Sequence, residues 1–177
     1  MTRFILHAQQ YVTMHNDYLW SASRSKWIKH GKPYKGCIFC GIAKNDPKIP
    51  KKLVYKDKEN MVIMNIFPYN TGHLEVIPIR HVENPLELTD EEYANLFFMV
   101  RKVILLLKKS LKPDGFNVGI NIGKGVAGAS IDHLHVHVVP RFKNEIGFME
   151  SLLGTKVMPE TLDQTYRKII KHVDILK

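Results

Sequence analysis

The sequence predicts an α+β fold, because several short runs typical of β-strands accompany one long run typical of an amphipathic helix. The 177 residues are 45% hydrophobic, which suffices for one well-buried core and is short for two. No low-complexity tract and no internal sequence repeat divides the chain. We therefore expect one compact domain.

The expected strands begin after an aromatic N-terminal segment. Two of them, residues 61–65 and 74–78, are separated by residues 68–72, which include Asn and Gly and so form turns at little cost. Antiparallel hairpin pairing is therefore expected here. Residues 53–55 predict an earlier strand, and the alternating residues 116–122 predict a later one.

A long helix is predicted to follow Thr89. Thr89 and Glu92 form a capping box, in which each side chain can bond the other residue's backbone amide. Apolar residues then recur at steps of three and four, and Pro113 ends the pattern. Residues 159–175 have similar spacing and predict a C-terminal helix. The expected core face of the long helix is Tyr93, Leu96, Phe97, Val100, Val103, Ile104, Leu107 and Leu111.

The charge and the termini restrict the class of protein. A formal net charge of +9 favours anionic partners such as nucleotides, RNA or lipid headgroups, without choosing among them. The first residues lack the apolar run of a signal peptide, and no uncharged apolar run approaches the roughly 20 residues of a membrane span. We expect a cytoplasmic protein that does not enter a membrane, with nucleic acid left open as a partner.

The chemistry is expected at three alternating histidines, His133, His135 and His137. In a β-strand alternate side chains share a face, so the three imidazoles should point the same way. A structural role would require three satisfied hydrogen-bond networks. Metal ligation, which needs neutral imidazoles, and nucleotidyl transfer, which needs an imidazole nucleophile, both remain open.

The only two cysteines, Cys37 and Cys40, are spaced to chelate a metal. A closed tetrahedral zinc site needs two more ligands, and His81 and His133 are the candidates. The glycine-rich residues 123–130 could bring backbone amides close to a phosphate. They match neither the Walker A sequence nor the dinucleotide-binding glycine fingerprint.

The run His133-Leu-His-Val-His-Val-Val139 matches every position of His-φ-His-φ-His-φ-φ, where φ is apolar. In this it resembles the histidine triad (HIT) superfamily. The resemblance covers roughly residues 37–165 and looks closest to the diadenosine polyphosphate phosphorylase branch. It implies a HIT-like antiparallel sheet of about five strands, a long packed helix and a homodimer. We expect an N-terminal extension over residues 1–36 and a catalytic domain over 37–177 with a C-terminal extension.

The resemblance also implies roles for individual residues. His135 would attack the α-phosphorus and form a nucleotidyl-imidazole intermediate, while His137 assists. Asn65 and Ile66 would line the nucleoside pocket. The remaining substrate-binding residues would be Asn121, Gly128, Ala129, Ser130 and His137, and family members with the cysteine pair bind zinc through residues that match Cys37, Cys40, His81 and His133.

The expected reaction is adenylyl transfer from a diadenosine polyphosphate to inorganic phosphate, giving ADP and ATP. Ala129 stands where hydrolytic members commonly carry glutamine, which disfavours water activation. One alternative is a hydrolase of dinucleoside polyphosphates or nucleoside phosphoramidates. Another is a non-catalytic, zinc-stabilised module that binds nucleotides or RNA and never forms a covalent nucleotide.

Overall fold

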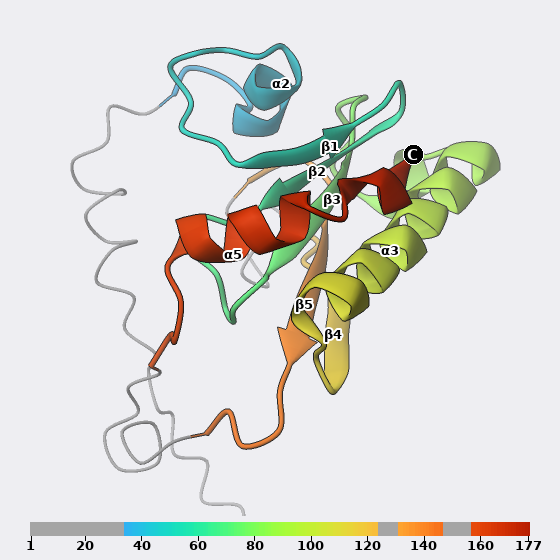
Figure 1. Ribbon diagram of the computed structural model, residues 1–177. Coiled ribbons are helices and arrows are strands. Elements are labelled where there is room, and N and C mark those ends of the chain that lie inside the picture. The colour runs from blue at the N-terminus through green and yellow to red at the C-terminus, as the bar shows by residue number, and fades with distance from the viewer. Residues whose placement is uncertain (1–33, 124–130, 147–156) are drawn as a thin grey trace, which may run out of the picture.

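The structure is a computed structural model that describes residues 34–123, 131–146 and 157–177. Its centre is an antiparallel sheet with the strand order β1-β2-β3-β5-β4 (Figure 1). The strands are β1 (Leu53–Lys56), β2 (Asn60–Met64), β3 (Leu74–Pro78), β4 (Gly115–Ile120) and β5 (Val136–Arg141). The predicted α+β fold with five antiparallel strands is confirmed. The expected boundary at residue 37 stays a prediction, since residues 1–33 lie outside the described ranges.

Helices cover both faces of this sheet. On one face lie α3 (Asp90–Leu111), α5 (Leu162–Ile170) and the 3-10 helix η2 (Val173–Leu176), and on the other lies α2 (Ile38–Ala43) (Figure 1). Strand alternation explains the two layers, because β2 directs Val62 and Met64 towards α3 and directs Met61 and Ile63 towards α2. The 3-10 helix η1 (Pro85–Glu87) precedes α3.

Helix α3 begins as predicted, with both bonds of the Thr89–Glu92 capping box present. Its buried face differs from the predicted one. Tyr93 is 46% exposed, whereas Met99 and Leu106 are buried. The contacts of α3 with α5 and η2, which the helix sequence alone does not reveal, rotate the buried stripe. No helix in the described part of the chain is long and apolar enough to cross a bilayer.

Strand β5 begins at Val136, so the prediction of one strand through all three histidines was wrong for His133 and His135. The ladder with β3 stops at the pair Val76 and Val136. Two residues further along β3 is Pro78, which has no N–H to extend the pairing. The chain before β5 bonds elsewhere, since the Leu134 amide donates to the Val82 carbonyl at 2.6 Å.

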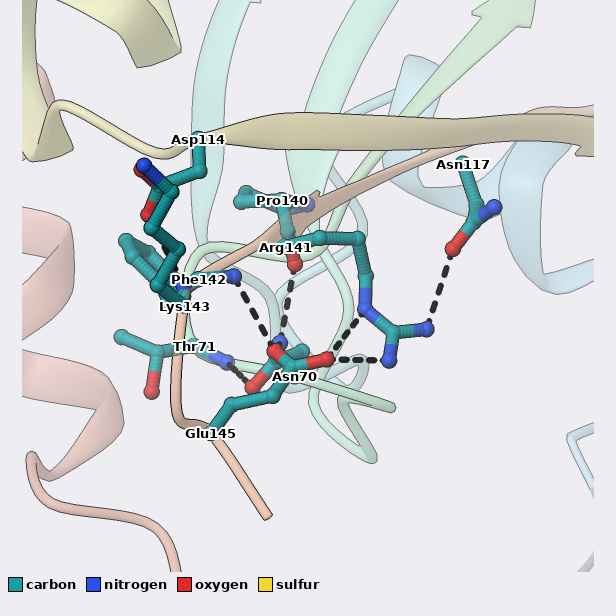
Figure 2. Close-up of polar contacts among 9 residues, drawn as sticks. All are labelled: Asn70, Thr71, Asp114, Asn117, Pro140, Arg141, Phe142, Lys143 and Glu145. Atoms are coloured by element: carbon teal, nitrogen blue, oxygen red, sulfur yellow. Dashed lines mark hydrogen bonds and ion pairs between the residues drawn. The ribbon is translucent and has the colours of Figure 1, made fainter.

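Polar side chains tie the turn between β2 and β3 to the end of β5 (Figure 2). The buried Asn70 Nδ2 donates to the Pro140 carbonyl at 2.9 Å and to Glu145 Oε2 at 2.5 Å. Arg141 Nε donates to Glu145 Oε1 at 2.5 Å. These bonds fix the turn that precedes His73 relative to β5.

Candidate active site and metal centre

A cavity of about 350 Å³ lies on the face of the sheet that α2 covers. Small-molecule pockets combine largely apolar walls with a few polar anchors, and this cavity has that character. Asn65 and Ile66, the two predicted nucleoside-pocket residues, both line it. Its other polar residues are Lys51, Lys52, Tyr69, Glu75, His135 and His137, and its apolar walls are Ile38, Phe39, Ile42, Ile49, Pro50, Ile63, Met64, Phe67 and Ile131.

The hydrogen bonds of His135 define its tautomer. Its Nδ1 lies 2.8 Å from the backbone carbonyl oxygen of His133. Because a carbonyl oxygen only accepts, Nδ1 carries the proton and Nε2 keeps its lone pair. Burial lowers the pKa of His135 below its usual 6.5, since a buried imidazolium is poorly solvated. The structure thus supplies the acceptor that a neutral imidazole nucleophile needs.

The tautomer of His137 follows from His73, to which the sequence assigned no role. The Tyr69 backbone N–H donates to His73 Nδ1 at 3.2 Å, so the proton of a neutral His73 lies on Nε2. That Nε2 lies 2.9 Å from His137 Nδ1 and donates to it. Burial lowers the pKa of His73 to about 3 and that of His137 to about 4, so both rings are neutral at pH 7. His137 therefore carries its proton on Nε2, which lies 3.4 Å from Asn121 Nδ2, so two N–H donors lie side by side there without bonding each other.

Glu75 is a site residue that the sequence reasoning missed. It lies buried in β3, pairs with His137 across the sheet and lines the cavity. Asn65 Nδ2 donates to Glu75 Oε1 at 2.7 Å, and the same oxygen lies 3.5 Å from His137 Nδ1. Burial raises the pKa of Glu75 to about 7. The available signal was a single charge inside the otherwise apolar strand 74–78.

His73 and His137 share a hydrogen bond and Glu75 accepts one from Asn65, so these three residues are not arranged as metal ligands, although their ligand atoms lie within 4.8 Å of one another. A metal-bound imidazole usually donates its second N–H to an acceptor. His73 instead accepts an N–H at Nδ1, so its Nε2 is protonated and has no lone pair to offer a metal.

The four predicted metal ligands come together beside the cavity. Cys37 caps α2 and Cys40 lies within it, while His81 follows β3 and His133 precedes β5. Their ligand atoms all lie within 4.8 Å of one another. The fold therefore gathers four donors of the types that soft and borderline metal ions prefer.

The distances between these donors fit a tetrahedral ion. His133 Nδ1 lies 3.3 Å from Cys37 Sγ and 3.7 Å from Cys40 Sγ, and His81 Nδ1 lies 3.3 Å from Cys40 Sγ. Zn–S bonds of about 2.3 Å and Zn–N bonds of about 2.0 Å would place neighbouring ligands roughly 3.5 Å apart. His133 Nε2 donates to the Pro78 carbonyl at 2.9 Å, which leaves the Nδ1 lone pair for a metal.

The predicted phosphate loop residues Gly128, Ala129 and Ser130 lie outside the described residues. The structure therefore brings together His135, His137, Asn65, Ile66 and Asn121 without placing that loop. A larger cavity, of about 580 Å³, lies between the end of α3 and the end of α5, and none of the three triad histidines lines it.

Comparisons with known proteins agree with this architecture. The family model described as the HIT domain matches residues 46–144. The chain is 43% identical to an AP-4-A phosphorylase of Mycobacterium tuberculosis (strain ATCC 25618 / H37Rv) over 116 residues, which are 66% of this chain and 56% of that protein. This chain thus spans about half the length of that relative. It is 32% identical to the adenosine 5'-monophosphoramidase of Schizosaccharomyces pombe over 126 residues, covering 71% of this chain and 90% of that protein.

Solved structures show the same likeness. A zinc-bound histidine triad family protein from Mycobacterium smegmatis is 28% identical with a TM-score of 0.66, and the match covers 80% of this chain and 95% of that one. A HIT family member from Bacillus subtilis is 34% identical with a TM-score of 0.58, covering 73% and 86% respectively. With more than half of its residues matched by the family model, the chain belongs to the HIT domain family.

Proposed function

We propose that this nucleotide-processing enzyme cleaves diadenosine polyphosphates by adenylyl transfer through His135, with inorganic phosphate as the acceptor. The observation that carries the proposal is the bond from His135 Nδ1–H to the His133 carbonyl, which leaves Nε2 as a neutral nucleophile. His135 also lines a cavity with the character of a ligand pocket. The relative named as an AP-4-A phosphorylase favours the same substrate class.

The reaction consists of two displacements. In the first, His135 Nε2 forms a bond to the α-phosphorus while the P–O bond to the departing nucleotide breaks and its electron pair stays on oxygen. In the second, an oxygen of inorganic phosphate attacks the phosphorus, and the N–P electron pair returns to Nε2. Diadenosine tetraphosphate would thus give ATP and then ADP. His135 keeps its Nδ1 proton in both steps, so it is cationic only in the adduct.

The other cavity residues would bind and orient the substrate. His137 Nε2–H and the Asn121 amide would donate to phosphoryl oxygens and stabilise their charge in the transition state. Asn65 and Ile66 would contact the ribose and the base. Gly128, Ala129 and Ser130 are proposed for the phosphate chain from the family resemblance alone.

We also propose that Cys37, Cys40, His81 and His133 bind a structural zinc ion. Support comes from the donor types and their spacing, and a zinc-bound relative is known from Mycobacterium smegmatis. A closed tetrahedral ion would make the site rigid. It would hold α2 beside His133, whose backbone carbonyl accepts the hydrogen bond from His135 Nδ1. A reducing cytoplasm would keep both thiols available. Elemental analysis should find about one zinc per chain.

A homodimer is proposed from exposed apolar side chains. Phe98 and Leu105 on α3 are 53% and 57% exposed, and Val118 on the edge strand β4 is 43% exposed. An unpaired strand edge and an apolar helix stripe are surfaces that a second copy could cover. Sedimentation should give a dimer that Phe98→Glu converts to a monomer, whereas a monomeric unsubstituted protein would contradict the proposal.

The test of the reaction is incubation with diadenosine tetraphosphate, with and without inorganic phosphate, followed by chromatography. ADP plus ATP that appear only with phosphate would support phosphorolysis. AMP plus ATP made in water would support a hydrolase, the alternative favoured by the likeness to a phosphoramidase. Tight nucleotide binding without any product or covalent adduct would contradict both and support a binding module.

A further inference from the structure

Glu75 is a buried carboxyl group inside the proposed nucleotide cavity, and the two displacement steps do not use it. Its side chain is 7% exposed, and its surroundings offer it little compensation for a negative charge. Asn65 Nδ2 donates one hydrogen bond to Oε1 at 2.7 Å. No lysine or arginine among the described residues forms an ion pair with it.

The titratable groups around Glu75 are mostly neutral. His73 beside β3 and His137 on β5 have pKa values lowered to about 3 and about 4 by burial, and burial also lowers the pKa of His135. The lysines on the cavity wall are Lys51 and Lys52, which precede β1. Lys52 is paired with Asp163 on α5, and Lys51 Nζ donates to the Asp46 carbonyl. Within residues 34–123, 131–146 and 157–177, Glu75 therefore has no cationic partner that would hold it as a carboxylate.

A bound phosphate chain would make the charged form still less favourable. His137 bridges the two positions, because its Nδ1 side faces Glu75 Oε1 at 3.5 Å and its Nε2–H is the proposed phosphate donor. A carboxylate and a phosphate on opposite sides of one imidazole ring repel each other, and the buried setting screens that repulsion poorly. Protonation of Glu75 removes the repulsion and leaves the Asn65 hydrogen bond to Oε1 intact.

We propose that Glu75 takes up a proton when a nucleotide phosphate chain binds beside His137, and that the neutral carboxyl is the form that positions Asn65 and His137. This inference rests on the proposed nucleotide function. Glu75 acts through its two neighbours and is a positioning residue. Nucleotide affinity is therefore coupled to pH through this one group. With the pKa of free Glu75 at about 7, proton uptake falls within the physiological range.

Calorimetry of diadenosine tetraphosphate binding tests the proposal. The ligand's own phosphates do not titrate near neutral pH, and a His135→Ala background prevents turnover. His135 is not one of the causes of the raised Glu75 pKa, which are burial and the Asn65 bond. Titrations in buffers of different ionisation enthalpy report the protons taken up. We expect about half a proton at pH 7 and almost none at pH 5.5, where Glu75 is already neutral.

Glu75→Gln in the same background is the matched variant, because glutamine mimics the neutral carboxyl and keeps an acceptor for Asn65. Between pH 6 and pH 8 the affinity of the Glu75 protein should fall about tenfold, since its neutral fraction falls by that factor around a pKa of about 7. The Glu75→Gln protein should change less than about twofold and take up no proton. A purely structural role for Glu75 would shift affinity equally at every pH.

Two results would overturn the proposal. If the Glu75→Gln protein still took up a proton and its nucleotide affinity still fell tenfold, His137 or another group would be the one that takes up the proton. If nucleotide bound to the Glu75 protein at pH 7 without proton uptake, the coupling would be absent while the proposed nucleotide site survived. A protein that bound no nucleotide would refute both. Infrared difference spectra of the Glu75 protein provide a check that needs no Glu75 variant, since nucleotide binding should create a protonated-carboxyl band.

Discussion

Replacing His73 with leucine should remove the hydrogen bonds that connect His137 to the turn between β2 and β3. His73 has no exposed surface, accepts from the Tyr69 amide at 3.2 Å and donates to His137 Nδ1 at 2.9 Å. Leucine fills much of the same volume and makes neither bond. The Tyr69 amide and His137 Nδ1 would then each lose the hydrogen bond to His73.

The expected size of the effect follows from these two bonds. A polar group that loses its hydrogen-bond partner inside a protein costs about 1–3 kcal/mol. For the two groups together, the free energy of unfolding would fall by about 2–6 kcal/mol. Burial of the more apolar leucine offsets about 2 kcal/mol, and we expect the free energy of unfolding to fall by up to roughly 4 kcal/mol. His137 could then adopt either tautomer. Groups that orient metal-bound histidines are worth about 10- to 100-fold, and we expect a similar loss in kcat/KM.

Urea unfolding followed by circular dichroism measures the stability, and phosphorolysis of diadenosine tetraphosphate measures kcat/KM on the folded variant. His172→Leu is the control, because His172 lies near the end of α5 and makes no side-chain capping bond to η2. It should change stability by less than about 0.5 kcal/mol and leave the rate unaltered. A His73→Leu protein with normal stability and normal kcat/KM would refute the reasoning.

Three further predictions concern the nucleophile, the metal and acid stability. His135→Ala should lower kcat at least about 1000-fold while the protein stays folded, and mass spectrometry should lose the adenylyl adduct on residues 133–141; an adduct on His137 would contradict this. Cys40→Ser should release zinc and lower the melting temperature, and an unchanged melting curve with bound zinc would show that Cys40 is not a ligand. Because the folded-state pKa of His73 is about 3 against an ordinary 6.5, the unfolded chain binds more protons, so stability is full above pH 6.5 and falls as the pH drops towards 3. Between pH 7 and pH 5 the free energy of unfolding of the unsubstituted protein should therefore fall by about 2 kcal/mol more than that of His73→Leu. Equal falls for the two proteins in urea titrations would count against a neutral buried His73.

Local sequence signals predicted most of the fold. The Thr89–Glu92 capping box and the apolar strand 74–78 appear where they were expected, because capping and strand alternation depend on residues close together in the chain. Helix α2 was not predicted, since its six residues are too few to display a period. The exposed Tyr93 was misplaced because α5 and η2, distant in sequence, decide which stripe of α3 is buried.

The chemistry of the site likewise depends partly on the sequence and partly on the tertiary structure. The sequence by itself determined which residue types were available: the alternating histidines, the chelating cysteines and the candidates His81 and His133. Only the tertiary structure decided that His135 donates to a backbone carbonyl, that His73 sets the tautomer of His137, and that Glu75 is buried beside it. A tautomer and a shifted pKa depend on which atoms lie within hydrogen-bond distance and on how much water is excluded. Those neighbours come from β3 and β5, whose pairing places Glu75 opposite His137 across a separation in sequence that no local pattern spans.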